Sequence, residues 1–66
     1  MPSIAILQEA KKLRTVSHNL DLLAEQHPLL SEALLMVSGN VRSTAALLEV
    51  LVLTKLGRSP DHINNK

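Results

Sequence analysis

The chain of 66 residues contains no Cys, Phe, Tyr or Trp and only two Gly. Without Cys it can form neither disulfides nor cysteine-based zinc sites. Without aromatic side chains it lacks the platforms on which many nucleic-acid-binding modules stack bases. Two glycines cannot build the Gly-rich loops that hold nucleotide phosphates, so we expect no cofactor. With a net charge of +1, the chain is also a poor electrostatic match for nucleic acids or anionic membranes.

The composition is nevertheless that of a folded protein. Hydrophobic residues make up 45% of the chain and charged residues 20%, values typical of folded domains. Cores of chains shorter than roughly 70–80 residues rarely supply more than about 3–5 kcal/mol of stability. Disulfides, a bound metal or another copy of the chain usually reinforce such small domains. Because this chain has no Cys, we expect it to oligomerise.

Apolar residues in the first part of the chain recur with helical spacing. Ile6, Leu13 and Leu20 form one row, Val16 and Leu23 form the adjacent row, and Ala10 and Ala24 flank them. This spacing indicates a helix that faces a core on one side. The opposite side carries Lys11, Arg14, His18, Asp21 and Glu25. With Ser3 suited to the N-cap and Pro28 disfavouring helical backbone at His27, we predict a helix over residues 3–26.

A second helix is predicted over residues 28–56. Pro28 suits its first position, and Gly57 suits the position just after its end. The apolar phase runs without interruption through Gly39, which favours one continuous helix. The alternative is a break or kink at Gly39, with Asn40 capping a third helix. We assign residues 1–57 to a single all-α domain and predict a disordered C-terminal tail over 58–66, which shows no apolar period.

The second half of this predicted helix is apolar around nearly its whole circumference. Within Ala45–Leu53 the only charged residue is Glu49. One helix of the same chain cannot cover such a surface, so a partner is expected there. The predicted interface comprises Leu30, Leu34, Val37, Val41, Leu47, Leu48, Leu51 and Val52. We expect two copies of the hairpin to form a dimeric four-helix bundle; a different helical protein is the alternative partner.

This plan resembles that of the Rop-type regulators of plasmid copy number, which are also dimers of helical hairpins. The likeness is one of architecture only, because no motif is shared. The sequence therefore predicts a non-catalytic interaction or assembly module, and no function is taken from the resemblance.

Residues with catalytic or metal-binding chemistry are few. His18, Asp21 and Glu25 stand three and four residues apart, a spacing that could hold a divalent ion on one helix face. They lie opposite the apolar stripe, however, where a solvated polar surface is the simpler interpretation. No Ser lies in a nucleophile elbow. We therefore expect no metal site and no active site, so the chain is predicted not to be an enzyme.

Nucleic-acid binding is the alternative function. The residues Gly39-Asn40, Ala45-Ala46 and Leu47-Leu48 resemble the opening of Fis-type helix-turn-helix domains. Where that family has a turn and a basic recognition helix, this chain continues with Glu49 and an apolar run up to Leu53. The remaining candidates for a phosphate-binding patch are Lys11, Lys12, Arg14 and Arg42. The sequence therefore disfavours nucleic acid as a partner.

The location expected from the sequence is the cytoplasm. Residues 1–7 carry no basic segment of the kind that opens a secretory signal, and Gln8 and Glu9 follow at once. The longest apolar stretch, Ala45–Leu53, is about half the length of a membrane-spanning helix. We therefore expect no membrane partner.

Overall fold

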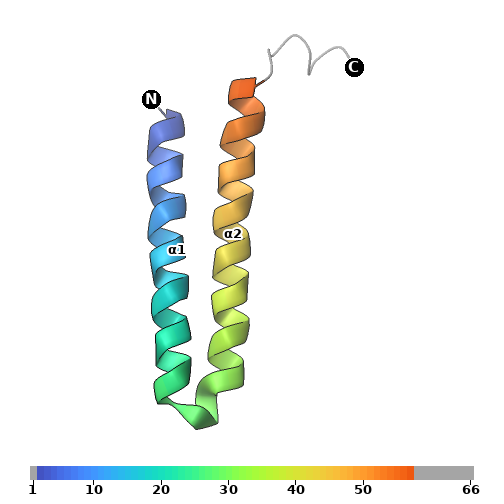
Figure 1. Ribbon diagram of the computed structural model, residues 1–66. Helices are drawn as coiled ribbons and strands as arrows, with labels where there is room; N and C mark the ends of the chain where they lie inside the picture. Colours follow the sequence, from blue (N-terminus) through green and yellow to red (C-terminus); the bar gives the residue numbers. More distant parts are fainter. Residues whose placement is uncertain (1, 58–66) are drawn as a thin grey trace.

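The computed structural model is an antiparallel hairpin of two long helices (Figure 1). It describes the backbone of residues 2–57 and the side chains of residues 3–54. Helix α1 spans Pro2–Gln26, a 3-10 turn, η1, spans Pro28–Leu30, and helix α2 spans Ser31–Gly57. The predicted all-α helical hairpin is thus confirmed. The predicted disordered tail, residues 58–66, lies outside the described residues.

The two helices begin and end close to the predicted residues. Helix α1 begins at Pro2, so Ser3 lies inside the helix and its prediction as the N-cap is wrong. Its end at Gln26 is confirmed: His27 leaves the helical region, with φ −132° and ψ 79°, as expected for the residue before a proline. Pro28 opens a 3-10 turn, closed by the Leu30 amide donating to the His27 carbonyl over 2.9 Å. The α-helical geometry predicted from residue 28 therefore starts only at Ser31.

Helix α2 is continuous through Gly39, so the alternative with a third helix is wrong. A Cβ built on Gly39 would meet no atom within 4 Å. The glycine is therefore not required by close packing inside the hairpin, and nothing in the single chain opposes a side chain there.

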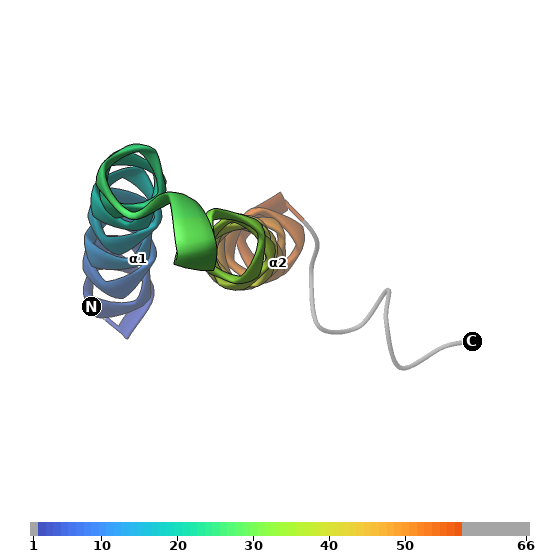
Figure 2. The same ribbon diagram turned by 90° about the horizontal axis from the view of Figure 1, so that it is seen from below.

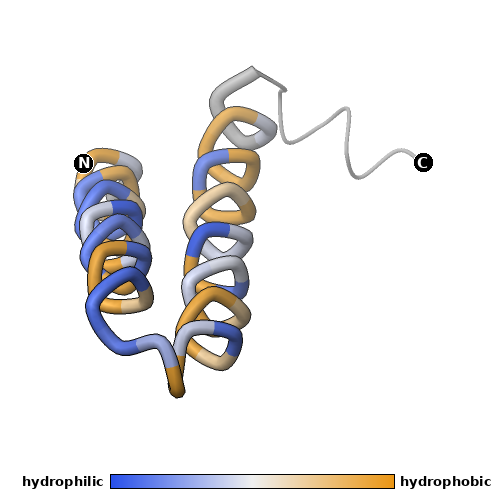
Figure 3. The backbone as a smooth tube through the Cα atoms, turned by 60° about the horizontal axis from the view of Figure 1, so that its bottom comes forward, coloured by the Kyte–Doolittle hydropathy of each residue, from blue (hydrophilic) through white to orange (hydrophobic). Residues whose placement is uncertain are grey.

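The hairpin is a single layer of two helices (Figures 1 and 2). Seen end-on, the two helices lie side by side, and no other described element covers either side of the pair (Figure 2). Apolar residues are more frequent along α2 than along α1 (Figure 3). A core can therefore form only along the line where the two helices meet.

By length and composition, the segment Pro28–Thr54 could cross a membrane. This differs from the expectation based on the shorter run Ala45–Leu53, because the hydropathy is averaged over a longer stretch. Core helices of soluble proteins meet the same criterion, so this helix does not assign the chain to a membrane or to the cytoplasm.

Candidate interaction surface

Small residues at every seventh position form the contact between the two helices. We call this contact the seam. It consists of Ala10, Ser17 and Ala24 on α1 and Ser38, Ala45 and Val52 on α2, each no more than 3% exposed. Small side chains allow two helix axes to approach closely, because little volume lies between the backbones. The seam contains no large aliphatic residue other than Val52.

Two buried serines meet in the middle of the seam. The Ser17 and Ser38 hydroxyl oxygens lie 2.7 Å apart, and each also lies close to the backbone carbonyl of the other residue, at 3.1 and 2.9 Å. The Ser38 hydroxyl also lies 2.6 Å from Asp21 Oδ1, and Arg42 reaches Asp21 Oδ2 over 2.9 Å. A hydroxyl has one proton, and one consistent arrangement has Ser17 donating to Ser38 while Ser38 donates to Asp21. Because unpaired buried hydroxyls are costly, this pairing favours one register of the helices.

An ion-paired flank borders one side of the seam. Arg14 makes a two-pronged contact with Glu49, at 2.8 Å from Nε and 2.7 Å from Nη2, and Arg42 pairs with Asp21. The hydrogen bond from Arg14 lowers the pKa of Glu49, and the same contact raises the pKa of Arg14. The sequence placed Arg14 and Asp21 on a solvated polar side of the first helix, whereas in the structure both pair with residues of α2.

These ion pairs show which sides of the two helices share a face of the hairpin. Arg14 and Asp21 each follow a seam residue of α1 by four positions, and Arg42 and Glu49 follow seam residues of α2 by four. These four side chains form two pairs between the helices. The positions four residues after seam residues therefore lie on the same face of the hairpin in both helices. The positions three residues after seam residues must then lie together on the opposite face.

That opposite face is apolar on both helices, and we call it the apolar face. Its inner rows lie four positions before or three positions after seam residues and are half-buried. They are Ile6, Leu13 and Leu20 on α1 and Leu34, Val41 and Leu48 on α2. Its outer rows contribute Val16 and Leu23 from α1, Leu30 from η1, and Val37 and Leu51 from α2, all 41–57% exposed. Large apolar side chains thus remain on the surface, while small ones are buried.

The predicted interface residues divide among three sides of α2. Six of the eight lie on the apolar face: Leu30, Leu34, Val37, Val41, Leu48 and Leu51. Val52 is 3% exposed and packs inside the hairpin, so it is not available to a partner. Leu47 follows the seam residue Ala45 by two positions and therefore lies on the side of α2 away from α1, where it is 68% exposed. The apolar run 45–53 is thus shared between the seam, the apolar face and the outer side.

Sequence reasoning missed the seam serines and both interhelical ion pairs. The recurrence of small residues at positions 10, 17 and 24 and at 38 and 45 was the available signal. A seven-residue spacing of serines does not indicate that they are buried, because a serine is equally suited to a solvated surface.

The four candidate phosphate-binding cations do not form a free basic patch. Arg14 and Arg42 are engaged by Glu49 and Asp21. Lys12 pairs with Glu9 over 3.0 Å, and Lys11 is exposed. The continuous helix through residues 39–53 also provides no turn for a helix-turn-helix motif.

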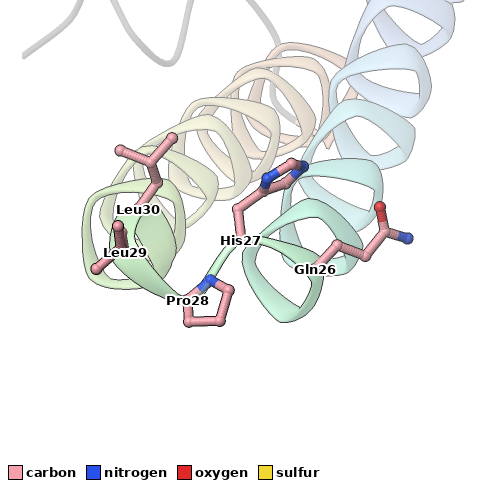
Figure 4. Close-up of a pocket in the computed structure, with 5 residues that line it drawn as sticks. All are labelled: Gln26, His27, Pro28, Leu29 and Leu30. Atoms are coloured by element: carbon pink, nitrogen blue, oxygen red, sulfur yellow. The ribbon is translucent and has the colours of Figure 1, made fainter.

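Neither a metal site nor a reactive cluster is found in the described part of the chain. His18, Asp21 and Glu25 do not form a group able to hold a metal ion, and Asp21 is engaged by Ser38 and Arg42. An open hollow of about 430 Å³ lies at the turn, lined by the consecutive residues Gln26–Leu30 (Figure 4). It contains a single titratable side chain, His27, and no acid or nucleophile beside it, so it offers no catalytic arrangement.

Comparison of the chain with models of known protein families, with curated proteins and with solved structures gives no match.

Proposed function

We propose that the chain is a small non-catalytic assembly module that forms a homodimer by pairing two apolar faces into a four-helix bundle. The observation that carries this proposal is the inverted placement of side chains by size. Among the described residues, the buried apolar side chains are three alanines and one valine, whereas the larger leucines, isoleucine and valines of the apolar face remain partly exposed.

The energetics favour association. Full burial of a Leu or Val side chain contributes about 1.5–3 kcal/mol, so covering the exposed part of eleven such residues contributes on the order of 10 kcal/mol per copy. Association of two chains costs an estimated 4–15 kcal/mol in lost freedom, which two such faces together can exceed. The single hairpin has no comparable source of stability.

A second copy is the occupant that this face fits best. In the register fixed by Ser17 and Ser38, Leu20 lies close to the level of Leu34, Leu13 to that of Val41, and Ile6 to that of Leu48. The face is therefore a flat strip of similar aliphatic side chains from both helices, which can pack against itself about a two-fold axis. A cytoplasmic location without a membrane partner is part of the proposal, because pairing covers the surface that would otherwise favour lipid.

The experiment is a measurement of solution mass by light scattering with refractive-index detection, since the chain has no Tyr or Trp. The unmodified chain is expected at about twice its 7.2 kDa mass. Two matched variants test the surface: Val37→Glu on the apolar face and Val50→Glu on the outer side of α2. The two valines are 47% and 52% exposed, so their effects in an isolated hairpin should be similar.

We expect Val37→Glu to yield a monomer, because two copies cannot bury unpaired carboxylates in the interface. Val50→Glu should remain a dimer. A monomeric mass for the unmodified chain with a sharp thermal transition would contradict the proposal, as would dissociation by Val50→Glu alone.

A further inference from the structure

We propose that the two-fold axis of this dimer runs parallel to the helices, so that both turns lie at the same end of the bundle. The inference rests on the proposed homodimer. Two arrangements can pair the apolar faces. With the turns at the same end, α1 of each copy packs on α2 of the other. With the turns at opposite ends, α1 packs on α1 and α2 packs on α2.

The distribution of polar residues within the apolar face distinguishes the two arrangements. Two rows of positions form the edges of the apolar face. One row is Glu9, Val16 and Leu23 on α1, and the other is Leu30 on η1 with Val37, Thr44 and Leu51 on α2. Glu9 and Thr44 are the polar members of these rows. In the register of Ser17 and Ser38, they lie within about 3 Å of one another along the helix axis. The polar positions thus form one layer between the middle of the hairpin and its open end.

With the turns at the same end, this polar layer meets the same layer of the second copy. Glu9, which accepts from Lys12, then faces Thr44 of the second copy, whose hydroxyl donates to the Asn40 carbonyl in the single chain and could donate to the carboxylate instead. The same displacement of about 3 Å sets Val16 against Val37 of the second copy and Leu23 against Leu30. These two apolar layers therefore meet apolar layers.

With the turns at opposite ends and the helices fully overlapped, the polar layer meets apolar residues. In that overlap the middle of α1, near residue 14, lies beside the middle of α1 of the second copy. Glu9 stands before this midpoint in its own chain, so it lies as far beyond the midpoint of the second copy, midway between the levels of Val16 and Leu23. The Glu9 carboxylate keeps its contact with Lys12, but this ion pair loses water against apolar side chains and gains no polar partner from the second copy, which is costly. Shifting the copies along the helices to avoid this contact would leave part of both apolar faces uncovered.

The parallel axis gives the bundle two unlike ends. One end carries both turns, each with Leu29 99% exposed beside the hollow of Figure 4. The other end carries the first residues of both α1 helices and the last turns of both α2 helices. With opposed turns, by contrast, the two ends would be identical.

Two single-thiol variants, Val16→Cys and Val37→Cys, test the arrangement in a chain that has no Cys of its own. Each variant is unfolded and refolded in glutathione redox buffer, alone and as an equimolar mixture. Disulfide-linked species are then identified by non-reducing electrophoresis and mass spectrometry. Because each chain carries one thiol, no disulfide can form within a chain. Val50→Cys, on the outer side of α2, replaces Val37→Cys in a control mixture for random collisions.

We expect the mixture to yield disulfide-linked dimers containing one copy of each variant, at least tenfold more than Val16→Cys yields alone or with Val50→Cys. Efficient cross-linking of Val16→Cys with itself would overturn the arrangement, because it requires α1 to pack on α1. A dimeric mass without the mixed disulfide would overturn it as well. A monomeric mass for the unmodified chain would instead remove the proposed dimer on which the arrangement depends.

Discussion

The seam and the apolar face have opposite characters although each draws on both helices. The seam residues are small, at most 3% exposed and arranged at seven-residue intervals. The apolar face consists of larger aliphatic residues, and its outer rows are 41–57% exposed. In an ordinary single-chain core, the larger aliphatic residues are the buried ones. The difference indicates that the seam sets the geometry of the hairpin, while the apolar face is the surface that a second copy would cover in the proposed dimer.

The largest effect on the hairpin itself is expected from enlarging a seam residue. Ala10 and Ala45 are both 0% exposed, so Ala45→Leu would force the helices apart and lower stability by about 3 kcal/mol. Thermal unfolding followed by circular dichroism, at fixed protein concentration, measures the loss. The control is Ser43→Leu, at an exposed position of the same helix. Equal melting temperatures for the two variants would show that the seam is not tightly packed.

Smaller losses are expected from the two buried serines. Ser17→Ala and Ser38→Ala each remove one member of a buried hydrogen-bonded pair, which should cost about 1 kcal/mol. The double variant should lose less than the sum of the two, because it leaves no unpaired hydroxyl at this contact. Chemical denaturation of the four proteins gives the coupling free energy. Strict additivity would mean that the serines contribute through their size and not through their mutual hydrogen bond.

A gain in stability is expected at Gly39. A Cβ there meets no atom within 4 Å, and alanine favours a helix over glycine by about 0.8–1.0 kcal/mol. Gly39→Ala should therefore raise the melting temperature, with Ser43→Ala as a comparison at an exposed position one turn further along α2. A lower melting temperature for Gly39→Ala would reveal that the outer side of α2 is packed closely against another molecule, which would weaken the contrast between the two surfaces.

The smallest effect is expected at the ion-paired flank. Because Arg14 lowers the pKa of Glu49 in the folded chain, their contact stabilises the fold at neutral pH. That contribution begins to fall near the ordinary Glu pKa of about 4.3 and is lost as the pH drops through the lowered folded value. The melting temperature of the unmodified chain should therefore fall slightly more than that of Glu49→Gln between about pH 7 and pH 3. Equal shifts would show that the half-exposed pair contributes nothing measurable.

Much of the hairpin could be predicted from the sequence because its signals are local. The seven-residue rows identified both helices, and Pro28 fixed the end of the first within one residue. The unbroken apolar phase across Gly39 correctly indicated one helix. The error at Ser3 was also local, since Pro2 can occupy the first position of a helix and leave the serine inside it.

The candidate site was predicted only in part. Six of the eight predicted interface residues share the apolar face, because they follow the same helical phase. Val52 and Leu47 do not, although they belong to the same apolar run. A helix that is apolar on all sides gives no indication of which side meets its neighbour in the chain.

The sequence by itself determined that this chain forms two long helices, where they turn, and that more apolar surface exists than one hairpin can bury. These properties depend on spacing and composition, which act over a few residues. Only the tertiary structure decided that small residues occupy the seam, that Ser17 meets Ser38, and that Arg14 and Arg42 lie with their acids on one face. Those contacts join residues 21 to 35 positions apart, and they depend on the rotation and register of one helix against the other. Local preferences leave that rotation open, and close packing at the seam fixes it.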